Sequence, residues 1–292
     1  MTGSRIECIP ADASLGAIIR GVDLGRLDDE AFARIEQAWH TYAVLIFERQ
    51  NLSNEAHLAF SRRFGRLERG LVRSSRRFTA HLSNLNRDGS LADTDSLQVR
   101  FNEGNQQWHT DSSYKRVGAK ASLLAARTVP SSGGETEWAD MRAGYEALDS
   151  ELQGWLADKV AVHSFEYSHA WHGGLELLSA QDVAELPPVQ HPVIRTHPET
   201  GRANLFVGRH ASHIVGQDVD ESRALLKRLT EQACQSPRTF KHRWREGDLA
   251  LWDNRCVLHR GHVWPFDQAR DMVRTTVAGD DADNEWAEPA IG

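Results

Sequence analysis

Short apolar runs recur along the chain and predict β-strands. The run 43–47 (Ala-Val-Leu-Ile-Phe) is too short and too rich in β-formers for a helix, which is typical of a buried strand. The turn signal 198–201 (Pro-Glu-Thr-Gly) between two such runs predicts a hairpin. On this basis strands are predicted at 5–10, 16–22, 43–47, 121–129, 136–140, 193–195, 204–207, 239–244, 248–252 and 272–278.

Apolar residues spaced three or four positions apart predict helices elsewhere. The acidic run 28–30 opens the first helix, because acidic side chains favour the first turn. Its apolar face consists of Phe32, Ile35, Trp39 and Tyr42. Ser53 caps a second helix, which Gly65 ends. Helical spacing also covers 145–159 and 220–234.

Two long segments lack a regular pattern. Residues 65–107 contain an arginine cluster, and residues 163–188 are rich in His, Gly and aromatic residues. A long irregular segment within a compact domain is usually an active-site lid or disordered. The arginines therefore fit either a solvated surface or a cover that attracts anions. The acidic end, 279–292, is expected to be a loose tail.

This order of elements predicts the fold class. Many short strands without strict alternation of strand and helix favour a mainly β fold, either a barrel or a double-sheet jelly roll, with helices added outside. We find no internal repeat and no linker that separates two parts of the chain. Residues 1–292 are therefore expected to form a single domain.

Composition limits the function. Charged residues make up 26% of the 292 residues, and a formal charge of −7 spread along the chain disfavours nucleic acid as a partner. No apolar run approaches membrane-spanning length, and residues 1–11 lack a signal-peptide pattern. Cys8, Cys234 and Cys256 form no CxxC pair, which indicates reduced thiols and a cytoplasmic location. An anionic small molecule would then need a locally basic pocket.

The strongest candidate chemistry lies in residues 108–114. His109 and Asp111 are two positions apart, so on an extended backbone both side chains leave the same face. An imidazole and a carboxylate suit a divalent first-row metal, and His259 is the best candidate for a third ligand. Two histidines and a carboxylate form the facial triad of non-haem Fe(II) oxygenases. The alternative is a zinc site, whose fourth ligand would be water, His210, His213 or His262.

Several motifs around these residues resemble one enzyme family. They are Trp108-His109-Thr110-Asp111, Gly133-Gly134-x-Thr136, Trp252-Asp253-Asn254-Arg255 with His259-Arg260, and Arg270 with Arg274. In this order and spacing they resemble the Fe(II)/2-oxoglutarate-dependent dioxygenases of the taurine dioxygenase family. The stretches 251–261 and 208–213 are most similar to the dichlorophenoxyacetate (aryloxyalkanoate) dioxygenase branch. The resemblance implies a double-stranded β-helix (jelly-roll) core, Fe(II), 2-oxoglutarate and O2, and a homo-oligomer.

The resemblance also implies roles for single residues. His109, Asp111 and His259 would hold Fe(II). Arg270, eleven residues after His259, would pair with the distal carboxylate of 2-oxoglutarate, because a guanidinium matches a carboxylate in a bidentate fork. Thr136 would donate its hydroxyl to the same carboxylate. The alternatives are a salt bridge at the pocket rim for Arg270 and a plain strand position for Thr136.

A second set of residues is implied on the substrate side. Arg274 lies four residues beyond Arg270, so both would lie on one face of a strand, and in the family this arginine pairs with the acidic group of the substrate. Asn105 matches a substrate-side position of taurine dioxygenase. His213 and Tyr114 are further candidates, either as substrate contacts or as scaffold.

The implied reaction is hydroxylation of a small organic acid, with 2-oxoglutarate converted to succinate and CO2. An aryloxyalkanoate hydroxylated beside its ether oxygen would fall apart to a phenol and a 2-oxo acid. The aromatic residues expected to cover its apolar body are Phe78, Phe101, Phe165, Tyr167 and Trp171. The alternatives are a dioxygenase for an alkylsulfonate, a sulfate ester or a natural small acid and, from another class, a zinc hydrolase or a non-catalytic metal-binding protein.

Overall fold

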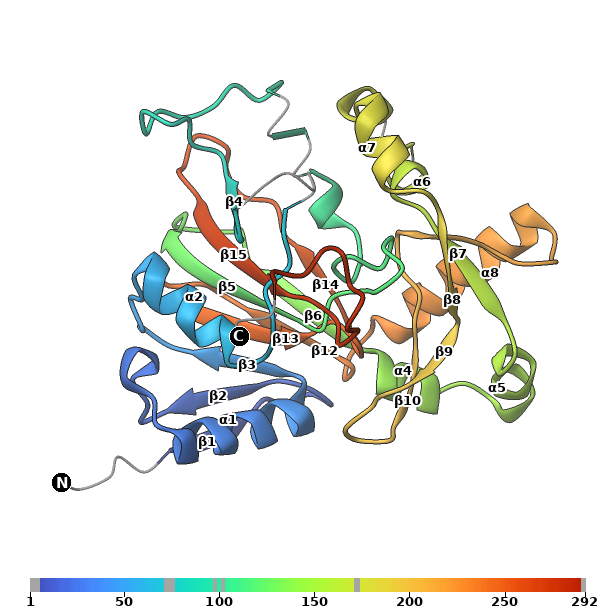
Figure 1. The fold of residues 1–292 in the computed structure, drawn as a ribbon, viewed down its shortest axis with the longest axis horizontal. Helices are drawn as coiled ribbons and strands as arrows, with labels where there is room; N and C mark the ends of the chain where they lie inside the picture. The colour runs from blue at the N-terminus through green and yellow to red at the C-terminus, as the bar shows by residue number, and fades with distance from the viewer. Residues whose placement is uncertain (1–5, 71–76, 97–98, 101–102, 171–173, 290–292) are drawn as a thin grey trace.

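A seven-stranded sheet forms the centre of the molecule. The computed structural model describes residues 6–70, 77–96, 99–100, 103–170 and 174–289. The sheet has the order β1-β2-β3-β13-β5-β15-β4, and its neighbours are antiparallel except for β2 and β3 (Figure 1). Its strands are β1 (Glu7–Pro10), β2 (Ala17–Arg20), β3 (Val44–Phe47), β4 (Thr79–Ser83), β5 (Ala121–Thr128), β13 (Leu249–Asp253) and β15 (Asp271–Val277).

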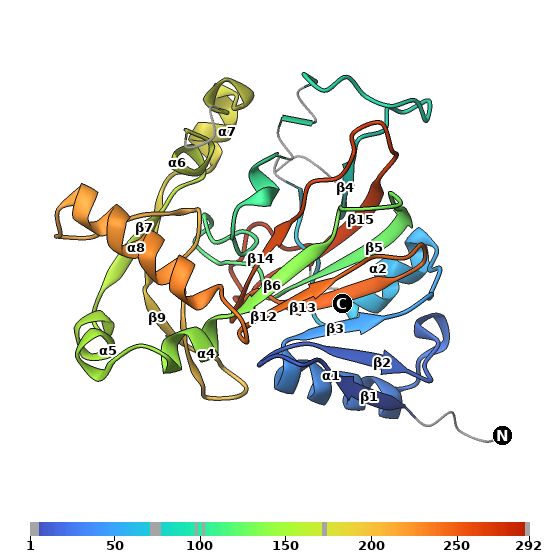
Figure 2. The ribbon, with the colours of Figure 1, turned by 180° about the vertical axis from the view of Figure 1, so that it is seen from behind.

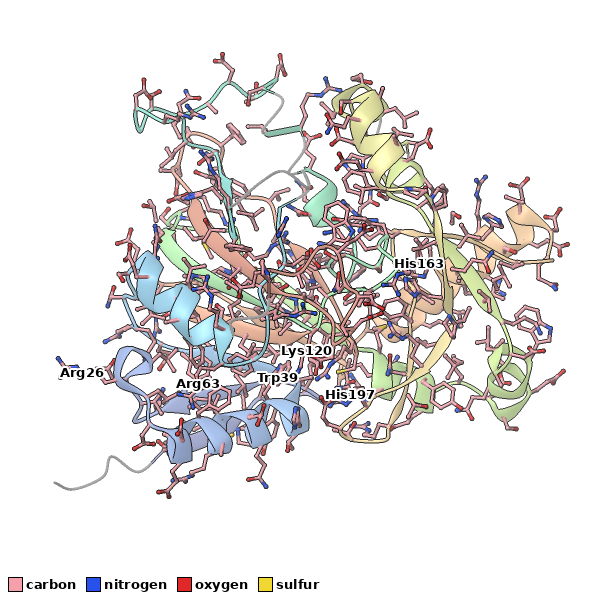
Figure 3. The ribbon with its side chains drawn as sticks, in the orientation of Figure 1. Arg26, Trp39, Arg63, Lys120, His163 and His197 are labelled. Carbon is pink, nitrogen blue, oxygen red and sulfur yellow. The ribbon has the colours of Figure 1, made fainter. Side chains whose placement is uncertain are left out.

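Strict alternation along these strands builds two apolar layers. In β3, Leu45 and Phe47 face one side of the sheet, whereas Val44 and Ile46 face the other. The first layer packs under two helices, α1 (Asp29–Tyr42) and α2 (Asn54–Arg62). Asp28, from the acidic run expected to open the first helix, is the N-cap of α1, and Ser53 caps α2 as predicted. Trp39 of α1 is fully buried in this layer (Figure 3).

The other layer lies between the large sheet and a smaller one. The smaller sheet has the order β12-β6-β14, with β6 (Thr136–Asp140) between β12 (Thr239–His242) and β14 (Val257–Gly261). Trp138 of β6 and Trp252 of β13 meet in the core between the sheets, with ring centroids 5.9 Å apart. Two facing sheets with helices outside form the jelly roll that was predicted.

A second group of elements lies beside the jelly roll, at the right of Figure 1 and the left of Figure 2. A three-stranded sheet, β11-β7-β8, packs against the helix α8 (Val219–Ala233), which buries Leu226 and Leu229. The predicted hairpin is also present as β9 and β10. The strands here are β7 (Val160–His163), β8 (Val189–Pro192), β9 (Ile194–Thr196), β10 (Ala203–Leu205) and β11 (Ala211–Ile214).

The other helices whose bounds the structure describes are short. They are α4 (Met141–Glu146), α5 (Ser150–Leu156), α6 (Phe165–Ala170), α7 (Ala180–Glu185) and the 3-10 turns η1 (Leu24–Arg26), η2 (Gly104–Gln106) and η3 (Leu175–Leu177). The single helix expected over 145–159 is therefore wrong, because Asp149 caps a new helix with its side chain on the amide of Leu152. The segment 163–188 is likewise not irregular, since it contains α6, η3 and α7.

The C-terminal residues 280–289 are packed, contrary to the loose tail that was expected. The Lys115 ammonium lies 4.0 Å from the centroid of the Trp286 ring, which is buried. The Glu288 carboxylate accepts hydrogen bonds from Arg62 and from the backbone amide of Leu67. In the described part of the chain, no helix is both long and apolar enough to cross a membrane.

Candidate active site

His109, Asp111 and His259 meet at one point. His259 lies on β14, and His109 pairs with it across an antiparallel bridge whose two N–H···O bonds measure 3.0 and 2.7 Å. The side-chain ligand atoms of all three residues lie within 4.8 Å of one another, and each residue is buried. The three residues that the sequence singled out are therefore brought together.

A hydrogen-bond network fixes the Asp111 carboxylate. Its Oδ2 accepts a hydrogen bond of 2.7 Å from Ser122 on β5 and lies 3.8 Å from His259 Nε2. The Asn254 side chain accepts from the Asp111 amide and from the Trp252 indole, and it donates to Ser122. Thr110 donates its hydroxyl to the Asn254 carbonyl. The carboxylate is thus oriented by the large sheet before any ligand binds.

The protonation states suit a metal. Burial lowers the pKa of His259 to about 4, and burial together with the charges of His259 and Arg209 holds the pKa of His109 well below its ordinary value. Burial would raise the pKa of Asp111, but the charges of Arg274 and of both histidines hold it below its usual range. Neutral imidazoles and an ionised carboxylate are the forms that bind a divalent cation.

The donor set fits a metal that keeps open positions. No fourth His, Cys, Asp or Glu joins this cluster among the described residues. Of the candidates for a zinc ligand, His262 bonds to Glu137 at 3.0 Å, and the His210 ring centroid lies 6.3 Å from that of His109. Three protein ligands of the N, N, O type match an iron facial triad better than a closed structural zinc site.

A second buried cluster, His197 with Asp253 and Cys256, has a structural explanation. His197 Nε2 lies 2.9 Å from Asp253 Oδ2, and its Nδ1 accepts from the amide of Thr200. Arg255 donates two hydrogen bonds to the same Asp253 carboxylate. Both ring nitrogens of His197 are therefore satisfied without a metal.

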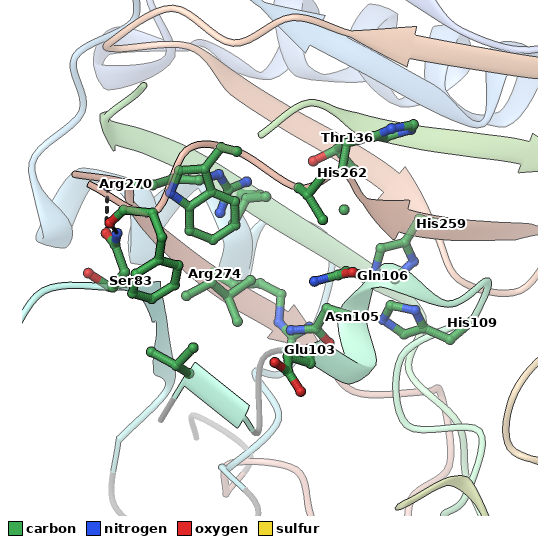
Figure 4. Close-up of a pocket in the computed structure, with 18 of the residues that line it drawn as sticks. Ser83, Glu103, Asn105, Gln106, His109, Thr136, His259, His262, Arg270 and Arg274 are labelled. Carbon is green, nitrogen blue, oxygen red and sulfur yellow. Dashed lines mark hydrogen bonds between the residues drawn. The ribbon is translucent and has the colours of Figure 1, made fainter. Parts of the chain in front are cut away.

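A pocket of about 270 Å³ opens beside the metal ligands (Figure 4). In Figure 4, Arg270 lies on one side of the pocket and His109 and His259 on the other, with Thr136 between them. Arg270 is 7% exposed, and it has no ion pair within the described ranges. Its guanidinium donates to the Gly134 carbonyl at 3.2 and 3.3 Å and stacks 5.0 Å from the Trp264 ring centroid. Arg270 therefore does not form the salt bridge at the pocket rim that was the alternative to co-substrate binding.

Local packing explains why residue 134, two positions before Thr136, is glycine. Gly134 has a φ of +69°, and a Cβ there would lie 3.0 Å from Arg270 Nε, so only glycine allows this approach. Thr136 begins β6, and its hydroxyl accepts a hydrogen bond of 3.0 Å from the Trp244 indole. Since the indole is only a donor, the hydroxyl hydrogen of Thr136 is left to donate into the pocket.

Arg274 extends from β15 into the same pocket, together with Asn105 of η2 (Figure 4). Its Nη1 donates to Asp111 Oδ1 at 2.6 Å, while its Nε is buried without a partner. Both arginines thus face the pocket, as the even spacing predicted. The apolar part of the wall consists of Leu82, Val99, Leu124, Trp252, Val263, Trp264 and Phe266.

Two substrate-side candidates are not brought to this pocket. His213 lies on β11, where its Nδ1 is 2.9 Å from the Ser212 hydroxyl, and the Tyr114 ring packs 4.5 Å from Phe165 and 4.9 Å from His210. Burial raises the pKa of Tyr114 above its ordinary value.

Of the two segments expected to cover the pocket, 65–107 and 163–188, one contributes to its lining. Residues of 65–107, among them Thr94, Val99 and Asn105, line the pocket, whereas no described residue of 163–188 does. The aromatic residues expected there, Phe78, Phe165 and Tyr167, lie elsewhere, and Phe101 and Trp171 lie outside the described residues. Trp264 and Phe266, which the sequence did not single out, line the pocket instead, and both lie in the loop between β14 and β15.

Comparisons with known proteins agree with this geometry. The family model described as taurine catabolism dioxygenase TauD, TfdA family, matches residues 7–276. The chain belongs to this dioxygenase family. The (S)-phenoxypropionate/alpha-ketoglutarate-dioxygenase of Sphingobium herbicidovorans is 41% identical over 284 residues, which cover 94% of this chain and 96% of that protein.

Two further proteins extend the comparison. The alpha-ketoglutarate-dependent 2,4-dichlorophenoxyacetate dioxygenase of Cupriavidus pinatubonensis is 40% identical over 279 residues, covering 93% of this chain and 97% of that one. The crystal structure of AAD-2 in complex with Mn(II) and N-oxalylglycine has a TM-score of 0.88 and 38% identity, and the match covers 95% of this chain and 98% of that chain. The predicted reaction class is thereby confirmed: the protein is an Fe(II)- and 2-oxoglutarate-dependent dioxygenase.

Proposed function

We propose that this dioxygenase hydroxylates an aryloxyalkanoate at the carbon between the ether oxygen and the carboxylate. His109, Asp111 and His259 hold Fe(II), Arg270 and Thr136 bind the distal carboxylate of 2-oxoglutarate, and Arg274 receives the carboxylate of the substrate. The observation that carries the assignment is the pairing of two arginines in one pocket, Arg270 without an ion pair in the described chain and Arg274 beside the metal ligands.

Iron with 2-oxoglutarate and dioxygen supplies the oxidising power, and 2-oxoglutarate leaves as succinate and CO2. The protein positions the reactants. A fork of two guanidinium N–H groups at Arg270 and the hydroxyl of Thr136 fix one end of 2-oxoglutarate, so that its 2-oxo acid end is turned toward His109 and His259. Burial of this end of the pocket excludes water and strengthens each of these contacts.

Arg274 sets which carbon of the substrate reacts. Its Nη1 is taken by Asp111, so its Nε and Nη2 are left to donate to a carboxylate. A carboxylate held there places the neighbouring carbon beside the metal ligands. The aliphatic residues and the rings of Trp264 and Phe266 then enclose an apolar aryl body. Hydroxylation gives a hemiacetal, whose C–O bond to the aryl oxygen breaks to release a phenol and a 2-oxo acid. Asn105 borders the same space and is assigned to the substrate side.

The test compares possible substrates by the succinate and phenol they produce. Phenoxyacetate, both enantiomers of 2-phenoxypropionate, taurine and an alkyl sulfate are offered with Fe(II), 2-oxoglutarate and O2. The proposal expects succinate with phenol from the phenoxy acids, and loss of that preference in Arg274→Ala but not in Arg228→Gln, an exposed control on α8. Taurine or the sulfate ahead by a wide margin would overturn the substrate and leave the reaction class intact.

The cytoplasmic location and the homo-oligomer are part of this proposal as well. The three cysteines are free, which fits a reducing compartment. Light scattering of the purified protein measures its mass in solution against the 32.8 kDa of one chain.

A further inference from the structure

The chain turns sharply directly after the metal ligand Asp111. The next residue, Ser112, has a φ of +58°, a left-handed conformation that is unfavourable for a residue with a Cβ. The turn is closed by the amide of Lys115, which donates to the Ser112 carbonyl at 2.9 Å. Backbone strain of this kind persists only where the surrounding structure holds it in place.

A buried ion pair holds this turn. The Ser112 hydroxyl donates to Glu68 Oε1 at 2.6 Å, and the Lys115 ammonium donates to the same oxygen at 2.7 Å. The side chains of Lys115 and Glu68 are only 1% and 5% exposed. A hydrogen bond to an ionised carboxylate is roughly twice as strong as one between neutral groups. Glu68 therefore binds both ends of the turn, at Ser112 and at Lys115.

The backbone of Glu68 is anchored independently of the turn. Its amide donates to the Thr276 carbonyl of β15 at 2.7 Å, and Glu68 pairs with Ala287 across an antiparallel bridge. The Trp286 ring of the same C-terminal segment lies 4.0 Å from the Lys115 ammonium. The position of the Glu68 carboxylate is thus set by β15 and by the C-terminal segment.

The turn completes the support of Asp111. Asn254 accepts from the Asp111 amide, and Ser122 donates to its carboxylate. The peptide that follows Asp111 is held through Ser112. Because the chain beyond it is anchored at Lys115, relaxation of Ser112 to a negative φ would rotate this peptide and turn the Asp111 side chain with it.

We infer that Glu68, acting through Ser112, is a positioning residue for the metal ligand Asp111, so that the affinity for the metal depends on this buried pair. The inference rests on the metal site of the proposed function and involves none of its substrate contacts. The partners that orient a metal ligand commonly contribute to metal affinity in this way.

A serine series tests the turn. Mn(II) is titrated into metal-free protein, and the electron paramagnetic resonance signal of free Mn(II) gives the Kd without turnover. Ser112→Ala keeps the Cβ and loses the hydroxyl, so we expect its Kd to rise roughly 10- to 100-fold. Ser112→Gly also loses the hydroxyl but adopts a positive φ without strain, so its Kd should stay within about threefold of the wild type. Ser113→Ala is the matched control, since the buried Ser113 hydroxyl has no hydrogen-bond partner among the described residues, and its Kd should not change.

A pair of glutamate variants separates positioning from stability. Glu68 and Glu288 are both 6% exposed, and each forms an ion pair, with Lys115 and Arg62 respectively. Glu68→Gln and Glu288→Gln should both lower the Tm of the metal-free protein, because each weakens its ion pair. Only Glu68→Gln should raise the Kd of Mn(II), again roughly 10- to 100-fold, because Glu68 bonds to Ser112 and Glu288 does not.

Three results would overturn the inference. They are an unchanged Kd in Ser112→Ala, an equal rise in Ser112→Gly and Ser112→Ala, and a rise in Glu288→Gln as large as that in Glu68→Gln. If Glu68→Gln does not fold, the serine variants decide, because none of them changes a charge. Asp111→Ala tests the proposed metal site itself. If Asp111→Ala binds Mn(II) as the wild type does, that site fails; if Asp111→Ala alone loses the metal, the site stands and the role of Glu68 is refuted.

Discussion

Replacement of Arg270 gives the sharpest test of the co-substrate assignment. The guanidinium is 7% exposed and lacks an ion pair among the described residues, so the distal carboxylate of 2-oxoglutarate would be its counter-ion. Removing one partner of a buried, hydrogen-bonded ion pair costs about 3–5 kcal/mol. At about 1.4 kcal/mol for each factor of ten, Arg270→Ala should raise the Kd of 2-oxoglutarate roughly 10²- to 4 × 10³-fold.

The assay is anaerobic titration of 2-oxoglutarate into Mn(II)-loaded protein, so that binding is separated from turnover. Arg270→Lys keeps the charge but loses the planar fork, and we expect its Kd to lie between those of the wild type and Arg270→Ala. Arg243→Gln is the control, since Arg243 is exposed and, among the described residues, bonds only to the carbonyl of Ser131. If Arg270→Ala binds 2-oxoglutarate as the wild type does, Arg270 is not the anchor.

Three further changes test the account. Gly134→Ala should weaken 2-oxoglutarate binding at least tenfold with Tm lowered by only a few degrees, because the new Cβ would displace Arg270; an unaltered Kd contradicts this. Glu288→Gln should lower the free energy of unfolding by about 1–3 kcal/mol, as its bonds to Arg62 and Leu67 weaken, and denaturant titration that shows no change would mean the tail is loose after all. Burial lowers the pKa of His57 to about 4, so as pH falls this imidazole is protonated in the unfolded chain before it is protonated in the folded protein. The free energy of unfolding of the wild type should then fall by about 3 kcal/mol between pH 6.5 and 4, and that of His57→Gln should not, as pH-dependent unfolding would show.

Local pattern accounts for the parts of the fold that were predicted. β3 and α1 carry their own signals, continuous β-forming residues in one and acidic caps with helical spacing in the other. β4 was missed because it is an edge strand of mixed polarity, Thr79–Ser83, held by its pairing to β15. β14 was missed because only two apolar residues, Val257 and Leu258, precede its polar residues, although this strand positions His259.

The site was predicted where the motif and its geometry coincide. The spacing of His109 and Asp111, and of Arg270 and Arg274, follows from local backbone and was visible in the sequence. The partners that orient these side chains come from distant parts of the chain, such as Ser122 for Asp111 and Trp244 for Thr136. The only sequence signal for this support was Asn254 within the Trp-Asp-Asn-Arg motif, because tertiary contacts leave no local pattern.

The central claim is that the site formed by His109, Asp111 and His259 couples oxidation of an organic acid to the conversion of 2-oxoglutarate to succinate and CO2. The most direct measurement is the ratio of phenol to succinate formed from phenoxyacetate with added Fe(II), in the wild type and in Asp111→Ala. The account predicts one phenol for each succinate in the wild type, with neither product and little retained iron in Asp111→Ala. Phenol release without succinate, or full coupled turnover in Asp111→Ala, would contradict it.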